Sequence, residues 1–207
     1  MPILVTFDGP KGVGKSTLLQ LVAEMLRSDG YLIEVLIEKD LMSEYLGDTI
    51  KLAYTELKTS PCKTSDLKIA LLHKQGRLAI SNEKMRTSCA DILLIDRWYP
   101  SDSVFRNYID TDKIIDDNIE SGVFLADICF AVTCDPIISW QRAHKRERQL
   151  DSKVIKNYDE HVISTKRFEQ SAEKYKWQII RSDTTSAESL CVQACSTIKS
   201  RLTGRCT

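Results

Sequence analysis

Glycines and a lysine–serine pair near the start of the chain could bind the phosphates of a nucleotide. Residues 9–17 read Gly-Pro-Lys-Gly-Val-Gly-Lys-Ser-Thr and match the pattern G-x-x-x-x-G-K-[ST] at every fixed position. Glycines leave backbone N–H groups unobstructed, and a following helix adds the positive end of its dipole. In this pattern Lys15 reaches the β- and γ-phosphates and Ser16 is a ligand of Mg²⁺. We therefore predict that the chain binds a nucleoside triphosphate with magnesium.

An acidic residue and an arginine follow an apolar segment in the middle of the chain. Residues 90–95 read Ala-Asp-Ile-Leu-Leu-Ile, which is typical of a buried parallel strand, and Asp96-Arg97 comes directly after them. The arginine indicates a second anion beside the triphosphate, because a guanidinium can hold a phosphate with two parallel hydrogen bonds. That anion would be the phosphate of an acceptor. Two other classes of nucleotide-binding protein are disfavoured. The guanine-reading Asn-Lys-x-Asp motif of GTPases is missing, and a motor ATPase would have an acidic pair, rather than Asp96-Arg97, at the end of this strand.

A strongly basic segment follows at residues 140–148, Trp-Gln-Arg-Ala-His-Lys-Arg-Glu-Arg. One interpretation is a solvated helix face partly balanced by Glu147. The other is a lid, at approximately residues 141–157, whose arginines close over the phosphates, because phosphoryl transfer requires neutralised charge and excluded water. The phosphate-binding pattern favours the lid. The residues predicted to bind the triphosphate are Gly9, Pro10, Lys11, Gly12, Val13, Gly14, Lys15, Ser16, Thr17 and Arg142.

Strands and helices alternate along the chain and would position these groups. Strands are expected at residues 3–8, 31–38, 90–96, 127–134 and 177–181. Helices are expected at 18–26, 40–60, 67–87, from about 101, and at 137–148, 159–174 and 186–202, with Ser65 a possible N-cap. This alternation predicts an α/β protein of the P-loop NTPase fold: one domain over residues 1–207, with a five-stranded parallel sheet, helices on both faces and a basic lid. Ligands of such sheets bind at the carboxyl ends of the strands.

Composition excludes several other classes. The chain has 207 residues, 43% of them hydrophobic and 28% charged, with a formal net charge of zero. A general binder of nucleic acid or of membrane surfaces would usually be basic, so we expect neither partner. No apolar run reaches transmembrane length and no signal peptide is recognised, so a cytoplasmic location is expected. The seven cysteines fit reduced thiols.

Taken together, these segments resemble the thymidylate kinase family of nucleoside monophosphate kinases over nearly the whole chain. The resemblance rests on four stretches: Phe7-Asp8-Gly9 leading to Gly14-Lys15-Ser16-Thr17; residues 71–77, Leu-Leu-His-Lys-Gln-Gly-Arg; Asp96-Arg97-Trp98 with Ser101 and Val104-Phe105; and Asp135-Pro136 leading to Arg142, Arg146 and Arg148. It implies transfer of a phosphoryl group from ATP to dTMP with Mg²⁺, giving ADP and dTDP. It also implies a homodimer.

The resemblance implies roles for individual residues. Arg97 would clamp the acceptor phosphate, Arg77 would hydrogen-bond a pyrimidine carbonyl, and His73 would replace a phenylalanine that stacks on the base. The implied catalytic residues are Lys15, Arg97, Arg146 and Arg148, and the implied metal ligands are Ser16 and Asp96. The implied substrate-binding residues are Asp8, His73, Arg77, Arg97, Ser101 and Phe105. Structural alternatives are an exposed Arg77, a satisfied or surface His73, Trp98 and Phe105 as core aromatics, and an internal Asp96–Arg97 ion pair.

Two departures from the family pattern leave the base and sugar preference open. Lys11 stands where the family usually has an acidic residue, and Glu38-Lys39-Asp40 replaces an Arg-Glu-Pro-like segment after the second strand. One rival hypothesis is a deoxynucleoside kinase in which Glu38, at the end of that strand, takes a proton from the 5′-hydroxyl. Another is a catalytically inactive, ATP-binding regulatory protein.

Overall fold

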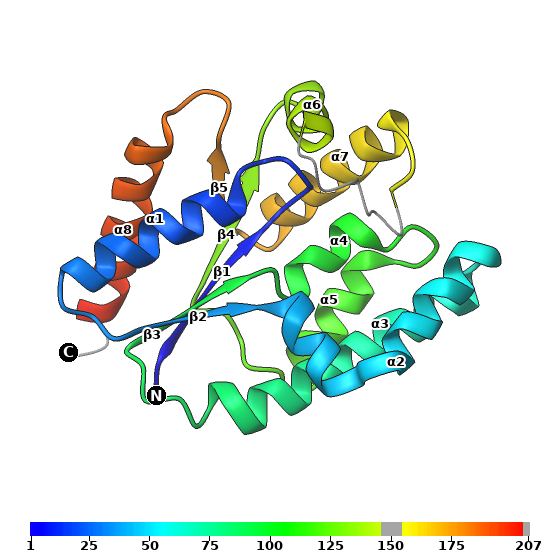
Figure 1. Cartoon of the computed structure of the whole chain (residues 1–207), viewed down its shortest axis with the longest axis horizontal. Helices are drawn as coiled ribbons and strands as arrows, with labels where there is room; N and C mark the ends of the chain where they lie inside the picture. The colour runs from blue at the N-terminus through cyan, green and yellow to red at the C-terminus, as the bar shows by residue number, and fades with distance from the viewer. Residues whose placement is uncertain (146–154, 205–207) are drawn as a thin grey trace.

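Five parallel strands form the centre of the molecule (Figure 1). The structure is a computed structural model that describes residues 1–145 and 155–204. The strands are β1 (Ile3–Asp8), β2 (Ile33–Ile37), β3 (Ile92–Asp96), β4 (Ile128–Thr133) and β5 (Gln178–Arg181). Their order in the sheet is β2-β3-β1-β4-β5, with Phe7 opposite both Asp96 and Phe130. The predicted five-stranded parallel sheet is confirmed.

Two helices cover one face of the sheet. They are α1 (Lys15–Ser28) and α8 (Ala187–Thr203), which lie side by side in Figure 1 and contact each other. Alternate residues of β1, such as Val5 and Phe7, point to this face and are fully buried against Leu19, Val22 and the α8 side chains. Burial of this apolar surface is the main source of stability on this side.

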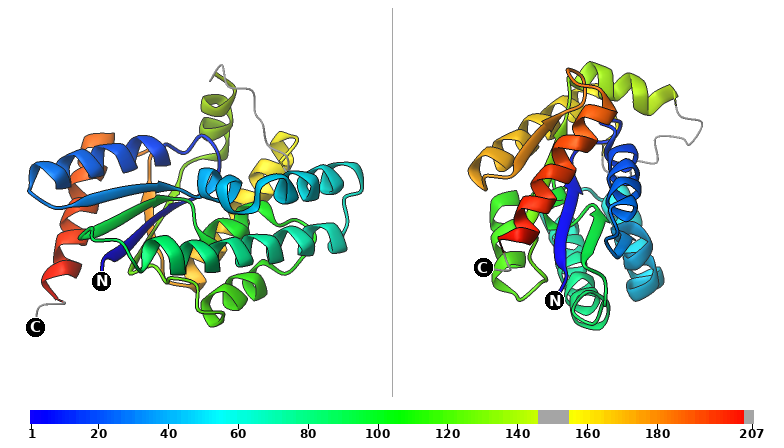
Figure 2. Two further views of the ribbon diagram at one scale, coloured as in Figure 1. Left: turned by 60° about the horizontal axis from the view of Figure 1, so that its bottom comes forward. Right: turned by 90° about the vertical axis from the view of Figure 1, so that its left-hand side faces the viewer.

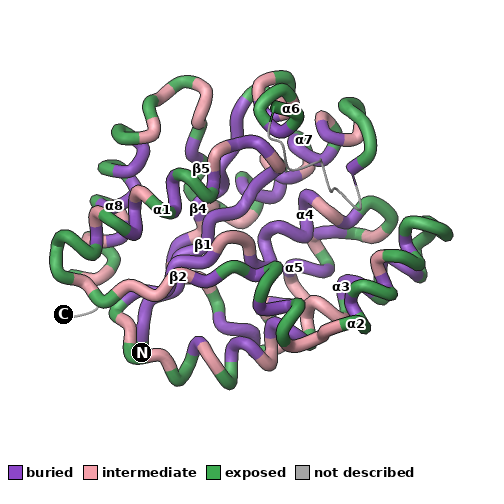
Figure 3. Tube along the Cα trace, in the orientation of Figure 1, coloured by how far each residue is buried: buried purple, intermediate pink, exposed green. Residues whose placement is uncertain are grey.

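The remaining helices lie on the other face or at the carboxyl edge. They are α2 (Glu38–Thr59), α3 (Lys63–Ile80), the π-helical turn η1 (Ser81–Met85), the 3₁₀ turn η2 (Tyr99–Ser101), α4 (Asp102–Phe105), α5 (Thr111–Glu120), α6 (Pro136–Lys145) and α7 (Tyr158–Lys174). The left view of Figure 2 shows α1 and α3 on opposite sides of the strands. Leu4, Leu93 and Ile95 face this second core, and buried residues follow the strands in Figure 3. Helices therefore cover both faces, as predicted.

Several boundaries differ from the prediction, and two of them involve polar residues. Strand β2 ends at Ile37, and Glu38 is already the first residue of α2 rather than the end of the strand, so no loop separates the two elements. Helix α2 is instead interrupted at Gly47, whose φ of 52° and ψ of −126° kink it. Helix α3 begins at Lys63, with Cys62 and not Ser65 at the N-cap. The Ser65 hydroxyl accepts from the Cys62 amide at 3.1 Å, which completes a capping box.

Within the described residues, no helix is both long enough and apolar enough to cross a membrane. The described cysteines are all free thiols.

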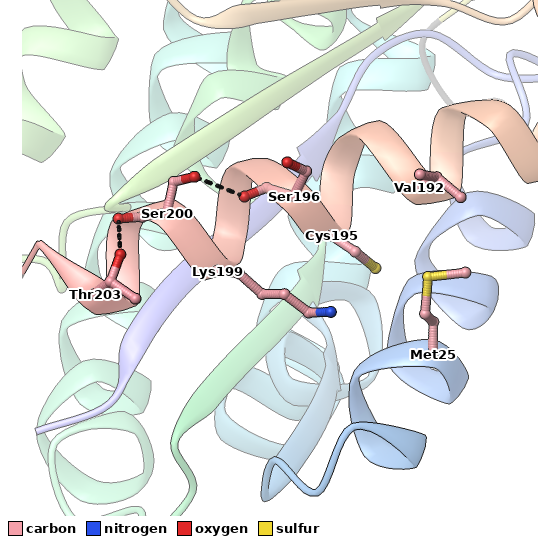
Figure 4. A pocket seen from close by; sticks show the side chains of 7 residues that line it. All are labelled: Met25, Val192, Cys195, Ser196, Lys199, Ser200 and Thr203. Atoms are coloured by element: carbon pink, nitrogen blue, oxygen red, sulfur yellow. Dashed lines mark hydrogen bonds between the residues drawn. The ribbon is translucent and has the colours of Figure 1, made fainter.

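A cavity of about 390 Å³ lies between α1 and α8 (Figure 4), where Met25 and Cys195 point into it. Met25 belongs to the last turn of α1, so this cavity lies at the opposite end of that helix from the phosphate-binding residues.

Candidate active site

The phosphate loop, residues 9–17, connects β1 to α1 at the carboxyl edge of the sheet. Gly14 is the N-cap of α1 and has no side chain with which to cap, so the amides of the first turn are left for an anion. Lys15 is 6% exposed, and its Nζ donates to the carbonyl of Pro10 at 2.8 Å, folding back over the loop. Val13 is fully buried, so only its backbone can face a phosphate. The loop has the form that anion binding requires.

Ser16 and Asp96 meet at the same edge. The Ser16 hydroxyl, in the first turn of α1, donates to Asp96 Oδ2 at 2.6 Å. Asp96 is the last residue of β3, which pairs with β1, so the sheet brings together two residues separated by 80 positions. A hydroxyl and a carboxylate are the oxygen ligands that Mg²⁺ prefers, and Mg²⁺ usually keeps phosphates and waters as its other ligands. The two predicted metal ligands therefore fit the ion.

A cavity of about 550 Å³ opens beside the phosphate loop. Its wall includes Gly12 and Thr17 on one side and, on the other, Ser182, Thr185 and Ser186 from the segment between β5 and α8. Arg142 of α6 lines it too and donates to the Ser182 hydroxyl at 3.3 Å. The cavity has room for the nucleoside part of a triphosphate held by the loop. The sequence predicted Arg142 but not Ser182, although a loop after a parallel strand is a usual ligand position.

Helix α6 packs directly on the phosphate loop at Gly12. Gly12 has a φ of +82°, and a Cβ there would lie 2.0 Å from the carbonyl oxygen of Ser139. Ser139 is held in turn by the buried His161 of α7, whose Nε2 lies 2.8 Å from the Ser139 hydroxyl. The loop and the helix that precedes the predicted lid are therefore in backbone contact.

Replacing Gly12 with alanine is expected to weaken ATP binding at least tenfold and to destabilise the fold by more than about 2 kcal/mol, because strain at positive φ adds to a collision with backbone. Isothermal titration with ATP and thermal unfolding would measure both effects. Gly30→Ala is the matched control, since Gly30 also has positive φ but a Cβ there would meet nothing within 4 Å. Equal effects of the two substitutions would show that contact with α6 does not matter.

Arg97 lies beside the phosphate loop. It follows β3 directly and has a φ of +72°, a left-handed conformation that is uncommon for a residue with a side chain. Its Nη1 donates to the carbonyl of Gly9 at 2.8 Å and to the Ser101 hydroxyl at 3.4 Å. The guanidinium carbon lies 4.7 Å from the centre of the Phe105 ring. The structure thus brings Arg97, Ser101 and Phe105 together, next to where a γ-phosphate would lie.

Asp8 lies behind this turn and is fully buried. Its Oδ1 accepts hydrogen bonds from the Trp98 amide at 2.9 Å and the Ser101 hydroxyl at 2.6 Å. Burial raises the pKa of Asp8 to about 6, against the lowering effect of those two hydrogen bonds. The predicted contact of Asp8 with substrate stays a prediction.

Arg77 is buried, at 1% exposed, so the exposed alternative is wrong. Its Nε donates to Glu38 Oε1 at 2.7 Å, and its Nη1 donates to Asp102 and, at 3.2 Å, to Asn118. Burial would raise the pKa of Glu38, but the neighbouring Arg77 and His73 lower it to about 2. Asp102 and Asn118 were not predicted, because nothing in their local sequence marks them.

His73 joins the same polar cluster. Its Nε2 lies 2.9 Å from the Tyr54 hydroxyl, and its Nδ1 lies 3.9 Å from Glu38 Oε1. Arg106, the residue after α4, donates to Tyr54 of α2 at 3.3 Å and to Asp66 of α3 at 3.0 Å, which extends the cluster to the end of α4. His73 is partly buried, so it is not a surface histidine, and its stacking on a base stays a prediction.

The predicted lid lies mostly outside the described residues. Arg146 and Arg148 fall in the range 146–154, so their predicted roles rest on sequence alone. The described part of the basic segment is the end of α6, where Arg142, His144 and Lys145 are exposed. Trp140 anchors this helix to α7 through its contact with the His161 ring, with 5.4 Å between ring centres.

Known proteins resemble this chain in sequence and in architecture. Residues 7–193 match the family model described as Thymidylate kinase. A thymidylate kinase of Staphylococcus haemolyticus is 28% identical over 181 residues, which cover 80% of this chain and 86% of that protein. A thymidylate kinase of Exiguobacterium sibiricum is 28% identical over 106 residues, which cover 50% of this chain and 48% of that protein. The crystal structure of the Ehrlichia chaffeensis thymidylate kinase superposes with a TM-score of 0.59 at 17% identity, covering 96% of this chain and 98% of that one, which shows a shared fold.

Proposed function

The chain belongs to the thymidylate kinase family, and we propose that it acts at the edge between the phosphate loop and Arg97. It is an ATP-dependent nucleoside monophosphate kinase: its acceptor is dTMP, and the products are ADP and dTDP. The observation that supports this site is the hydrogen bond of 2.8 Å from the Arg97 guanidinium to the carbonyl of Gly9. It holds an acceptor-binding cation against the loop that binds the donor phosphates.

The donor side is supplied by the loop and by α6. Lys15 and the amides at the start of α1 would bind the β- and γ-phosphates, and Arg142 would close the nucleoside cavity. Ser16 and Asp96 would hold Mg²⁺, which when bound neutralises charge on the phosphates. Arg146 and Arg148 would bring further positive charge from the lid, which we propose at approximately residues 141–157 of a single domain spanning 1–207.

The acceptor side is supplied by the turn after β3 and by α3. Arg97 would hold the dTMP phosphate so that one of its oxygens attacks the γ-phosphorus in line, which reduces the entropy cost of the reaction. Phe105 and Ser101 would border the same phosphate, since both contact Arg97. We place the pyrimidine near His73 and Arg77, where Arg77 would read a carbonyl and His73 would stack. No covalent enzyme intermediate is required.

A product assay tests this function directly. Purified protein would be incubated with Mg²⁺-ATP and a panel of nucleosides and nucleoside monophosphates, and the products separated by chromatography. We expect dTDP from dTMP and no product from thymidine. Formation of dTMP from thymidine would instead establish a deoxynucleoside kinase. Binding of ATP without a product from any acceptor would establish an inactive binding protein.

The geometry of Glu38 disfavours the deoxynucleoside kinase. A general base works best with a pKa near the working pH, whereas Arg77 and His73 hold the pKa of Glu38 near 2. Its carboxylate is committed to the Arg77 Nε at 2.7 Å. Glu38 therefore has the environment of a counter-ion.

Glu38→Gln is expected to lower the turnover of dTMP by less than about tenfold, because the amide oxygen can still accept from Arg77 and no proton transfer depends on the carboxylate. Steady-state kinetics with dTMP and with thymidine would measure this. Glu34→Gln, which removes a carboxylate of β2 that accepts from Ser88 at 2.7 Å, is the matched control. A loss of turnover of more than about 100-fold in Glu38→Gln but not in Glu34→Gln would indicate instead that Glu38 acts as a general base.

We also propose that the protein acts in the cytoplasm and as a homodimer. Both proposals rest on membership of the family rather than on a feature of this chain. Light scattering of the purified protein would test the second, with a molar mass near twice 23.6 kDa as the expected result.

A further inference from the structure

We propose that Asp8 is a positioning residue that holds Arg97 in the conformation that meets the acceptor phosphate. The inference rests on the proposed function, because it concerns the residue assigned to that phosphate. Asp8 is the last residue of β1 and is fully buried, so it lies under the turn rather than in the space a nucleotide would occupy. In this inference Asp8 acts on the reaction through Arg97, which is an alternative to the direct substrate contact predicted from the sequence.

The backbone at Arg97 requires an external support. Its φ of +72° lies in the left-handed region, which is costly for a residue with a Cβ. Two successive amides attach this turn to the end of β1. The Arg97 amide donates to the carbonyl of Phe7 at 3.1 Å, and the Trp98 amide donates to Asp8 Oδ1 at 2.9 Å. The second attachment is made by a side chain and is therefore open to mutation.

A second route from Asp8 reaches the guanidinium itself. The same Oδ1 accepts from the Ser101 hydroxyl at 2.6 Å, and the Ser101 oxygen accepts from Arg97 Nη1 at 3.4 Å. Asp8 thus holds both the start and the end of the turn from Arg97 to Ser101. With these attachments the guanidinium lies between the Gly9 carbonyl, at 2.8 Å, and the Phe105 ring, at 4.7 Å.

Because only one carboxylate oxygen of Asp8 contacts the turn, a substitution can distinguish a positioning role from a role of the negative charge of Asp8. Within the part of the chain that the structure describes, Asp8 Oδ2 is buried and makes no hydrogen bond to the turn after β3. Only Oδ1 makes the contacts described above, and an asparagine can present the same acceptor. Asp8→Asn should therefore keep the support of Arg97, whereas Asp8→Ala removes it.

The experiment compares Asp8→Ala and Asp8→Asn in steady-state kinetics against dTMP and against ATP. Asp8→Ala is expected to lower kcat/KM for dTMP about 100-fold, as small misplacements of a positioning group do, with KM for ATP within about threefold of wild type. Asp8→Asn is expected to recover to within about fivefold of wild type. Asp127→Ala is the matched control, because the Asp127 carboxylate accepts from the Leu4 amide at 3.0 Å near the other end of β1.

A double substitution tests the route through Arg97. Added to Arg97→Met, Asp8→Ala is expected to cost no more than about threefold further, because the two effects are coupled. An Asp8→Asn enzyme as defective toward dTMP as Asp8→Ala, or additive losses in the double variant, would overturn the inference. If Asp8→Ala fails to fold, Asp8→Asn and Ser101→Ala carry the same comparison. A wild type that does not phosphorylate dTMP would instead overturn the proposed function.

Discussion

Replacing Arg77 with methionine is expected to lower the free energy of unfolding by about 3–5 kcal/mol, because the buried Glu38 carboxylate loses its guanidinium partner and Asp102 keeps only Arg106, whose Nε lies 3.5 Å from Asp102 Oδ1. Arg77 is 1% exposed and donates to both Glu38 and Asp102. Each carboxylate is nearly as buried, with side chains 7% and 3% exposed. Methionine is similar in length but donates no hydrogen bond, so it fills much of the volume and removes the charge. Urea unfolding at pH 7 would measure the loss.

At acidic pH the difference in the free energy of unfolding between wild type and Arg77→Met should become smaller. The pKa of Glu38 in the folded wild type is about 2, below its ordinary value of 4.5, so the stability from its ionised form is present above pH 4.5 and is lost as the pH falls toward 2. The Arg77→Met variant lacks that contribution and therefore loses less stability as the pH falls. Arg27→Met is the control, because Arg27 is exposed on α1 and donates to the Ile33 carbonyl at 3.2 Å. A loss below about 1 kcal/mol in Arg77→Met would contradict the importance of this network.

Replacing Lys15 with methionine is expected to lower kcat by about 100- to 1000-fold, the usual cost of removing a donor aimed at developing charge. The Lys15 ammonium is 2.8 Å from the Pro10 carbonyl, poised over the loop where the β- and γ-phosphates would lie. Both KM for ATP and kcat should change, since the same charge acts in binding and in transfer. Rapid-quench measurement of dTDP formation would separate the two.

The control for Lys15 is Lys199→Met, which removes an ammonium paired with Asp29 at 2.7 Å on the far end of α1. Its kcat should equal that of wild type. A Lys15→Met enzyme within about tenfold of wild type would exclude the phosphate loop as the donor site.

Much of the fold followed from patterns that are local in sequence. The apolar run before Asp96 marks a strand whatever its neighbours are, and residues at the carboxyl ends of parallel strands must share an edge. This is why the sequence alone could place Ser16 and Asp96 together, and why Arg97 could be assigned to the same edge.

The buried polar cluster could not be derived in the same way. Glu38 and Arg77 are 39 positions apart, and Arg77 and Asp102 are 25 apart, on three helices whose packing decides the contact. Asp8 shows the same limit over a longer separation in sequence, 90 positions to Trp98 and 93 to Ser101. Its type and position suggested a ligand-binding residue, but only the path of the turn after β3 reveals that its oxygen accepts from Trp98 and Ser101.

The strand order also constrains when the site can form during synthesis. β3 lies between β1 and β2, so the first two strands to leave the ribosome are not partners of each other. Neither has a neighbour until residues 92–96 have been made, and long-range pairing of this kind is slow. The phosphate loop, although encoded near the very start of the chain, therefore becomes a binding site only after nearly half of the chain exists. Tight nucleotide binding by a nascent chain would therefore indicate that β1 and β3 have paired.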